Sequence, residues 1–338
     1  MKKIDITELA IILETPKEIV ISTHVNPDGD ALGSSLAMFN YLSKKGHKVN
    51  VIVPNNYPDF LSWLPGSNNI IILENQLDKC NKLIRNADII FSLDYNSLDR
   101  VKKIKDEIIN SDAIKVLIDH HPNPEMDQFN FVYSTTNTSS ASELVYEVIC
   151  KLGDKKLIDI KIAECIYTGI ITDTGSFSYL CNNENTYLIA GNLIKLGVDG
   201  ENIHRLVYDD FSANRLKLLG YCLSEKLKVI DEYSTAFIYL SAADLKKFNY
   251  QVGDTEDVVN YPLSMKNIKM SALFTEKENV VRISFRSKGD FHVNEIAKEH
   301  FEGGGHKNAA GGDSYLSLED TISKFEKLLP LYKKELSR

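Results

Sequence analysis

Short apolar runs rich in β-branched residues alternate with helical periodicity along the first part of the chain. Such runs occupy residues 18–24, 48–53, 88–94 and 113–119. Between them, residues 31–45 and 97–109 carry apolar positions at helical spacing. Buried strands that alternate with helices are typical of a parallel sheet covered on both faces. We therefore predict an α/β domain built on a parallel sheet.

The remainder of the chain predicts a connector and a second domain. Ser140 and Glu143 have the spacing of a capping box and predict a helix start. The run GIITDTGSF predicts a strand followed by a turn. Helical periodicity then predicts an interdomain connector, and the strand-like segments AFIYL and VVRISFR with a glycine cluster predict a smaller α/β domain. The predicted parts are an N-terminal α/β domain, a helical connector and a smaller C-terminal α/β domain: 1–185, 186–225 and 226–338.

Composition and charge restrict the classes of function. A chain of 338 residues with 43% hydrophobic content is long enough for two packed domains. No stretch approaches the roughly twenty apolar residues of a membrane helix, so we expect no membrane association. The net charge of −8 argues against binding of long nucleic acid, but it is compatible with small phosphorylated substrates. Scattered cysteines without a CxxC pair predict free thiols and a cytoplasmic location: Cys80, Cys150, Cys165, Cys181 and Cys222.

Four predicted strand ends carry carboxylates or imidazoles. In parallel sheets, carboxyl ends of strands share one edge, where ligands collect. A single Asp at such a position is often only a helix cap, so each motif alone is compatible with a structural role. All four together favour one site that binds divalent metal ions. The candidate residues, in chain order, are His24, Asp28 and Asp30; Asp94; Asp119, His120 and His121; and Asp173.

These motifs, in this order, resemble motifs I to IV of the DHH phosphoesterases. The segment FEGGGHKNAAGG at 301–312, with the preceding SFRS, resembles the signature of the DHHA1 domain. Glu302 departs from the pattern, because many relatives carry another glycine there, but the GGGH core is intact. The overall pattern is similar to the nano-RNase/pAp-phosphatase group of this superfamily.

The resemblance implies two divalent metal ions that activate water for attack on phosphorus. It implies that one ion is held by His24, Asp28 and Asp94, and the other by Asp30, Asp94, His120 and Asp173, with Asp94 bridging. Mixed imidazole and carboxylate ligands, together with the resemblance, favour Mn²⁺. We expect His121 to contact the phosphate or protonate the leaving oxygen, and Asp119 to orient a ligand histidine.

The second half of the chain is expected to bind the substrate. Gly303, Gly304 and Gly305 can present successive backbone N–H groups to a phosphate, although a glycine-rich loop often only turns. His306 adds a donor, and Arg286 on the preceding strand presents a fork of donors that matches phosphate oxygens. For the lesser candidates, a solvated helix face or a loop cap is an equal explanation: Arg100 and Asn294.

The function that these expectations favour is hydrolysis of very short RNA fragments to mononucleotides, with removal of the 3′-phosphate from pAp. A phosphodiesterase for cyclic dinucleotides or their linear products would share both domains and all four motifs. A nucleotide sensor without turnover would lack a metal ligand, whereas every motif position is filled here. Pyrophosphatases lack the GGGH-bearing domain, and a RecJ-like processive exonuclease needs further DNA-binding domains. A homodimer is compatible with the sequence, although no residue pattern specifies it.

Overall fold

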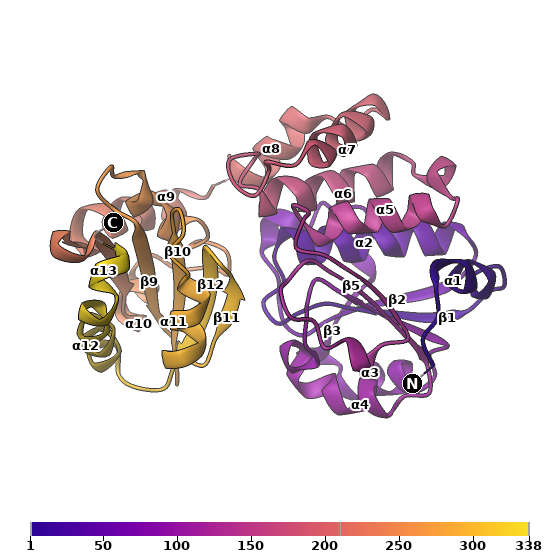
Figure 1. Ribbon diagram of the computed structural model, residues 1–338, viewed down its shortest axis with the longest axis horizontal. Coiled ribbons are helices and arrows are strands. Elements are labelled where there is room, and N and C mark those ends of the chain that lie inside the picture. Colours follow the sequence, from indigo (N-terminus) through magenta and orange to yellow (C-terminus); the bar gives the residue numbers. More distant parts are fainter. Residues whose placement is uncertain (1, 210, 337–338) are drawn as a thin grey trace. The chain divides into compact units, whose positions relative to one another are not determined.

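The computed structural model describes residues 2–209 and 211–336. Residues 1, 210, 337 and 338, which the predicted domains include, lie outside the described residues. The chain forms two compact units, Met1–Asp210 and Phe211–Arg338, each built on its own sheet (Figure 1). The predicted boundaries of the connector stay a prediction.

The first unit contains a six-stranded sheet in which every neighbouring pair is parallel. The strand order is β3-β2-β1-β4-β5-β6, so the chain winds outward in one direction from β1 and then in the other from β4. In a doubly wound sheet this reversal leaves a crevice at the carboxyl ends of the two central strands. The predicted α/β class is confirmed. The strands are β1 (Glu18–Ser22), β2 (Lys48–Val53), β3 (Ile70–Ile72), β4 (Ile89–Leu93), β5 (Ile114–Asp119) and β6 (Phe131–Ser134).

Helices cover both faces of this sheet (Figure 1). Alternate strand residues point to opposite faces: Ile19 and Ile21 join the core beneath α2, α5 and α6, whereas Val20 joins the core beneath α3 and α4. The helices α7 and α8 pack against α6 rather than on the sheet. The helices of this unit are α1 (Ile6–Ile12), α2 (Gly29–Lys44), α3 (Leu77–Arg85), α4 (Lys105–Asn110), α5 (Ala141–Lys151), α6 (Ile160–Asp173), α7 (Glu184–Lys195) and α8 (Gly200–Tyr208).

Three local predictions in this unit are corrected. The segment that includes Asp173 is the last part of helix α6 and not a strand. This segment is rich in β-branched and apolar residues because α6 is buried against α2 and α5. Gly169 allows α6 to pack closely on α5, since a Cβ at this position would overlap Ser142. Ser140 caps α5, but Glu143 accepts from Ser139 and does not complete a capping box. The helix predicted at 97–109 begins as a 3₁₀ helix, Leu98–Ile104.

The second unit contains a mixed six-stranded sheet of order β11-β12-β10-β9-β8-β7, in which only the β8–β9 pair is parallel. Aromatic side chains fill its core, with Phe237, Phe274 and Phe285 around Phe325. The strands are β7 (Leu227–Ile230), β8 (Thr235–Leu240), β9 (Met270–Glu276), β10 (Val281–Ser287), β11 (Gly304–His306) and β12 (Ala309–Ser314). The helices are α9 (Ala213–Tyr221), α10 (Ala242–Lys247), α11 (Val293–His300), α12 (Leu318–Leu328) and α13 (Lys333–Leu336).

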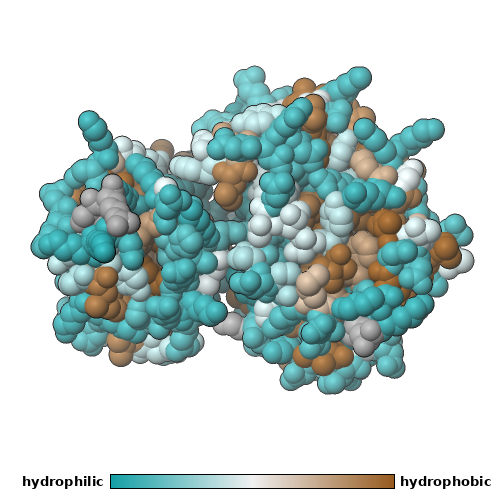
Figure 2. Space-filling view, in the orientation of Figure 1, coloured by the Kyte–Doolittle hydropathy of each residue, from teal (hydrophilic) through white to brown (hydrophobic). Residues whose placement is uncertain are grey.

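The surface is mainly polar. On the face drawn in Figure 2, hydrophilic side chains dominate and hydrophobic ones form small groups between them. Within residues 2–209 and 211–336, no helix has both the length and the apolar character to cross a membrane.

Candidate metal centre

The six predicted metal ligands gather at the carboxyl edge of the parallel sheet. His24 follows β1, Asp94 follows β4 and His120 follows β5, so the three central strands each deliver one of them. Asp28 and Asp30 lie at the start of α2. Asp173 arrives from the C-terminal end of α6 instead of from a strand. The switch point of the sheet therefore brings together residues that are far apart in sequence.

Two groups of ligand atoms share the Asp94 carboxylate. In the first group, Nε2 of His24 lies 3.3 Å from Oδ2 of Asp94 and 3.9 Å from Oδ2 of Asp28. In the second group, Nε2 of His120 lies 3.2 Å from Oδ1 of Asp94 and 3.8 Å from Oδ2 of Asp30. The ligand atoms of each set, His24/Asp28/Asp94 and Asp30/Asp94/His120, lie within 4.8 Å of one another. Oδ2 of Asp173 is 3.2 Å from Nε2 of His120.

The backbone fixes the carboxylates individually. Asp94 has a φ of 62°, a left-handed conformation that Asp tolerates better than most residues, and its N–H donates to the carbonyl of Ile118. Asp30 is fully buried and accepts hydrogen bonds from the N–H groups of Ala141, at 2.6 Å, and Ser142, at 2.8 Å. These N–H groups begin α5, whose positive end stabilises the carboxylate. Asp28 caps α2 and is half-exposed.

Burial and mutual charge shift the pKa values strongly. Burial, followed by the charge of Asp94, raises the pKa of Asp30 to about 7. Burial opposes the charged form of His120, but the charges of Asp173, Asp94 and Asp30 prevail and raise its pKa to about 10. Burial alone would raise the pKa of Asp94, yet the imidazoles of His120 and His24 hold it well below its usual range. The pKa of Asp173 is raised, chiefly by burial. Such a cluster favours positive charge between its members.

The donor set fits divalent cations. Nδ1 of His24 is 3.0 Å from the carbonyl of Val25, so a proton on Nδ1 leaves Nε2 free to act as a ligand. Oδ1 of Asp94 is buried, and the groups around it are imidazole nitrogens, Nε2 of His120 at 3.2 Å and Nδ1 of His121 at 3.7 Å. A buried carboxylate is costly unless positive charge neutralises it. Two divalent ions would balance the four negative charges of Asp28, Asp30, Asp94 and Asp173.

Asp119 contacts a different histidine from the one expected. Its Oδ1 lies 2.8 Å from Nδ1 of His121, and its Oδ2 accepts the backbone N–H of His121 at 3.0 Å. Burial, followed by the charge of Asp94, raises the pKa of Asp119 to about 7. The prediction that Asp119 orients a ligand histidine is therefore replaced: it orients His121, the histidine that was not assigned to a metal.

Arg100 lies close to the first group of ligands. Its backbone carbonyl accepts the N–H of Val25 at 2.9 Å, which ties the 3₁₀ helix Leu98–Ile104 to the loop that carries His24. Burial lowers the pKa of His24, but the hydrogen bond to Asp94 and the charge of Asp28 outweigh burial, so the pKa is raised. The positive charge of Arg100 opposes this increase. Arg100 is thus available as a cation beside the cluster.

The glycine cluster of the second unit is a strand and not an open loop. Gly304, Gly305 and His306 form the edge strand β11, paired with β12. The N–H of Gly303 is already used, because it donates to the carbonyl of Ala297. The expectation that three successive N–H groups face a phosphate is therefore wrong for Gly303. Gly303 is needed for close approach, since a Cβ there would overlap the carbonyl of Gly311, whereas a Cβ at Gly304 would meet nothing within 4 Å.

The two remaining candidates of this unit lie on neighbouring elements. Arg286 is on β10, paired with Ala309 of β12 and Ser271 of β9, and its Nη1 donates to the carbonyl of Phe285. Asn294 is in the first turn of α11, and its buried Oδ1 accepts no hydrogen bond from the residues that the structure describes. A buried acceptor of this kind is a place where a ligand can donate.

Sequence reasoning missed the groups that hold Asp30. The backbone N–H groups of Ala141 and Ser142, and the small residue Gly169 beside them, create its binding pocket. The signal was present in the run Ser139-Ser140-Ala141-Ser142, because small residues at a helix N-terminus leave backbone donors accessible to an anion.

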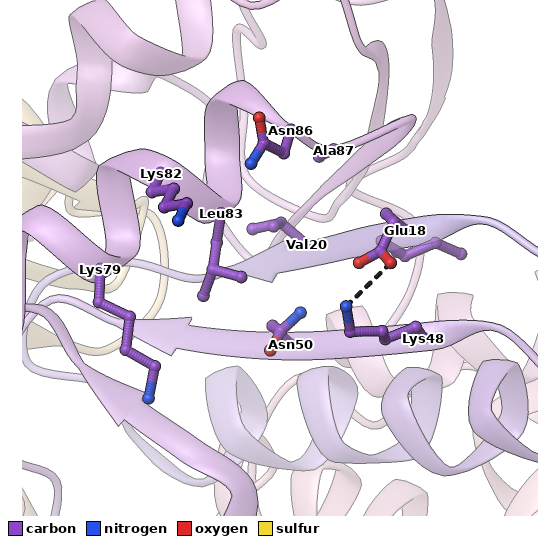
Figure 3. Close-up of a pocket in the computed structure, with 10 residues that line it drawn as sticks. Glu18, Val20, Lys48, Asn50, Lys79, Lys82, Leu83, Asn86 and Ala87 are labelled. Carbon is purple, nitrogen blue, oxygen red and sulfur yellow. Dashed lines mark hydrogen bonds and ion pairs between the residues drawn. The ribbon is translucent and has the colours of Figure 1, made fainter.

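A separate pocket lies at the other end of the strands. It has a volume of about 430 Å³ and is lined by residues of β1, β2 and α3, including Asn50, Lys79 and Lys82 (Figure 3). Glu18 and Lys48 form an ion pair at its edge, with 2.9 Å between Nζ and Oε1 (Figure 3). None of the predicted site residues lines it, so the carboxyl edge of the sheet is the candidate functional site.

Comparisons with known proteins agree with this geometry. Residues 18–170 match the DHH family, N-terminal domain, and residues 234–336 match the DHHA1 domain. A probable bifunctional oligoribonuclease and PAP phosphatase NrnA from Streptococcus mutans is 32% identical, over 93% of this chain and 95% of that protein. A bifunctional oligoribonuclease and PAP phosphatase NrnA from Thermus thermophilus is 30% identical, over 98% of this chain and 94% of that protein. The crystal structure of an exopolyphosphatase-related protein from Bacteroides fragilis is 43% identical, covers 98% of this chain and 97% of that one, and superimposes with a TM-score of 0.93.

The fold, the cluster and these matches define the class: the protein is a hydrolase that acts on phosphate ester bonds. The match to the Streptococcus mutans protein extends over 93% of the chain, which includes most of both domains. The chain belongs to the DHH/DHHA1 phosphoesterase family.

Proposed function

We propose that the protein hydrolyses RNA fragments of a few nucleotides to mononucleotides and removes the 3′-phosphate from pAp, with two divalent ions, Mn²⁺, as cofactors. The names of the relatives that are 32% and 30% identical support this substrate class. The observation that carries the proposal is the pair of ligand groups that share Asp94. All five cysteines are free, which supports a reducing, cytoplasmic setting.

The chain's own residues divide the work at the cluster. His24, Asp28 and Asp94 hold one ion, while Asp30, Asp94, His120 and Asp173 hold the other. When bound, the ions supply activation of water and neutralisation of charge on the phosphoryl group. The N-terminus of α5 holds the Asp30 carboxylate in position, and Arg100 adds a cation beside the first group.

His121 acts on the substrate and is positioned by Asp119. The contact between Oδ1 of Asp119 and Nδ1 of His121 favours a proton on Nδ1 and holds the ring. Once Nε2 of His121 also carries a proton, it donates a hydrogen bond to a phosphate oxygen or gives that proton to the leaving oxygen.

The second unit binds a phosphate or terminal nucleotide of the substrate. Arg286 supplies a guanidinium fork, and His306 supplies a ring donor. Gly304 and Gly305 let the substrate approach the backbone of β11 closely, and the Oδ1 of Asn294 accepts from the ligand. Gly303 contributes to the shape of the hairpin only.

A substrate panel with Mn²⁺ tests the proposal. The panel contains an RNA dinucleotide, an oligomer beyond the roughly 4–16-nucleotide sites of single-strand binders, pAp, cyclic di-AMP and inorganic tripolyphosphate. Fast turnover of the dinucleotide and pAp with slow turnover of the long oligomer is expected. Preference for cyclic di-AMP or for tripolyphosphate would refute the substrate assignment while leaving the metal chemistry intact.

The Asp119→Asn variant tests the positioning of His121. The amide can present NH₂ to Nδ1 of His121 and so disfavours the tautomer that Asp119 selects. We expect kcat to fall about 10–100-fold, with the thermal shift on adding Mn²⁺ unchanged. Loss of the thermal shift would mean that Asp119 supports a metal ligand instead.

A further inference from the structure

The pocket of about 430 Å³ at the amino ends of β1 and β2 has the size of a small-molecule site. It lies on the face of the sheet that α3 covers, where the buried Cys80 and Ile84 attach the helix to the strands. The pocket is open there because β3 pairs only with Val51–Val53. The first half of β2, Lys48–Asn50, therefore has no strand of the described chain on its outer side.

The floor of this pocket is apolar and contains one amide. Val20 of β1 and Asn50 of β2 are paired in register and both line the pocket. Leu83 extends from α3 towards the strands (Figure 3). The Asn50 side chain makes no hydrogen bond with any residue that the structure describes, and neither does that of Asn86 at the rim. Both amides are thus open to a bound molecule.

Lysine side chains surround the apolar floor. Lys79 and Lys82 are spaced i, i+3 on α3, so both lie on the helix face that borders the pocket. Neither forms an ion pair with a residue in the described part of the chain, and Nζ of Lys79 donates to Oε1 of Gln76 at 3.0 Å. Lys48 lines the pocket from β2, and Glu18 is the one carboxylate in the lining.

The charge of the lining favours an anion. Its three ammonium groups and one carboxylate give a net charge of +2, on a chain whose net charge is −8. The ion pair between Lys48 and Glu18 does not block an anion, because the two side chains are 72% and 45% exposed and such exposed pairs are weak. Lys48 can therefore turn to a phosphate together with the two lysines of α3.

We propose that this pocket is a binding site for a nucleoside monophosphate, separate from the metal ligands. The phosphate lies among the three lysines, and the base covers the apolar floor, where the Asn50 amide pairs with its polar edge. Inorganic phosphate would leave the floor and the amide unused, and an uncharged nucleoside would leave the lysines unused. The site is at the opposite ends of the strands from the metal cluster, so its occupant does not block hydrolysis.

Equilibrium dialysis with labelled AMP tests the site. The full chain is dialysed with EDTA, so that no divalent ion attracts the phosphate to the ligand cluster. The wild type should bind one more equivalent of AMP than Lys79→Glu/Lys82→Glu. The matched control is Lys156→Glu/Lys161→Glu, two exposed lysines of the same unit outside the pocket, and it should bind as the wild type does. Equal stoichiometry in the wild type and the pocket variant would overturn the proposal.

Competition against labelled AMP tests the two parts of the ligand. Adenosine, ribose 5-phosphate and inorganic phosphate should each compete about tenfold or more weakly than AMP, because each lacks the base or the phosphate. Equal competition by inorganic phosphate would reduce the pocket to a simple anion site and contradict the proposal.

The Asn50→Leu variant tests recognition of the base. Leucine has nearly the size of asparagine but no hydrogen-bonding atoms, so the Kd for AMP should rise about tenfold, while competition by inorganic phosphate stays unchanged. An unchanged Kd for AMP would refute the placement of the base.

Folding and hydrolysis are measured on the same variants. The exposed lysines predict thermal melts equal to the wild type, and a pocket variant that melts early is replaced by Lys79→Gln/Lys82→Gln and judged by the same criterion. Dinucleotide hydrolysis by the pocket variant should match the wild type, and its loss would place these lysines in the substrate site instead. Because AMP binding is measured without turnover, failure of the proposed function would leave the dialysis result standing.

Discussion

At the scale of single residues, Asp94 is the position on which the site depends. It is the only residue common to the two ligand sets assigned to metals, and its left-handed backbone conformation aims one carboxylate at two imidazoles. The sequence predicted that Asp94 closes a strand, because four of the five residues before it, in the run IIFSL, are apolar. It did not reveal the positive φ, because that conformation arises from the pairing of β4 with β5 and the bond to Ile118.

The Asp94→Asn variant is a sharper test than alanine, because Asn also tolerates the left-handed conformation. Hydrolysis should fall by more than about 100-fold, since loss of an outer partner of a metal ligand alone costs 10–100-fold. Mn²⁺ should no longer raise the melting temperature, whereas it should stabilise the wild type by about 2.7 kcal/mol at a hundred times its Kd. Retained activity with a normal thermal shift would remove Asp94 from the bridging role.

At the scale of elements, the strands and helices that place the site were predictable where periodicity was strong. Segments 48–53 and 113–119 agree with β2 and β5 to within a residue. The position of Asp173 at the end of a helix was not predictable. A helix that is buried on most sides lacks the polar face by which helices are recognised, and its β-branched run resembles a strand. The glycine cluster was likewise taken for a loop, since three residues of glycine and histidine have no strand propensity of their own.

Two adjacent glycines in that cluster give a matched pair. Gly303→Ala should destabilise the second unit by roughly 1–3 kcal/mol, because the new methyl would overlap the Gly311 carbonyl. Gly304→Ala should change stability little, since nothing lies within 4 Å of its Cβ. Urea unfolding of both variants measures the difference. Equal stability of the two would mean that the β11–β12 hairpin is looser than described.

Asp244, which completes the capping box at the start of α10, should make the stability of the second unit depend on pH. Asp244 accepts from Ser241 and Tyr221 and pairs with Lys226 at 2.8 Å. Burial opposes ionisation, but these contacts hold its pKa well below the usual range. Because the pKa of Asp244 is lower in the folded than in the unfolded chain, its ionised form stabilises the fold above about pH 4, the pKa of Asp in an unfolded chain. This stabilisation is lost as the pH falls towards the pKa of Asp244 in the folded protein.

Asp244→Asn should therefore cost roughly 1–3 kcal/mol at pH 7 and progressively less below pH ~4. Urea denaturation across pH measures this difference. Glu232→Gln, which removes an exposed ion pair with Lys333, is the control and should cost little at any pH. A pH-independent cost for Asp244→Asn would mean that its charge contributes nothing and that only packing is lost.

At the scale of the whole molecule, the proposed function divides chemistry and recognition between the two units. The first unit gathers acidic ligands at a sheet edge, while the second offers Arg286, His306 and a glycine hairpin. The sequence predicts this division because each half carries its own motif, and the division stays a prediction.

The division predicts separable kinetic effects. Arg286→Ala should raise KM for a dinucleotide about tenfold or more, the loss of one charge-assisted contact, and leave kcat within about twofold. Arg282→Ala, on the same face of β10, should leave KM unchanged. A fall in kcat with KM intact would move Arg286 from substrate binding to the chemical step.

The strand order of the first sheet has a consequence for how the protein acquires its metals. The proposed ligands come from positions as far apart as His24 and Asp173, and they meet only when β1 lies between β2 and β4 and the chain has passed through α6. A nascent chain that ends before α6 can hold at most an incomplete set, and an unfolded chain holds none in place. On the proposed ligand set, the complete site exists only in the finished domain, so metal-binding energy would stabilise the finished domain and not its incomplete precursors.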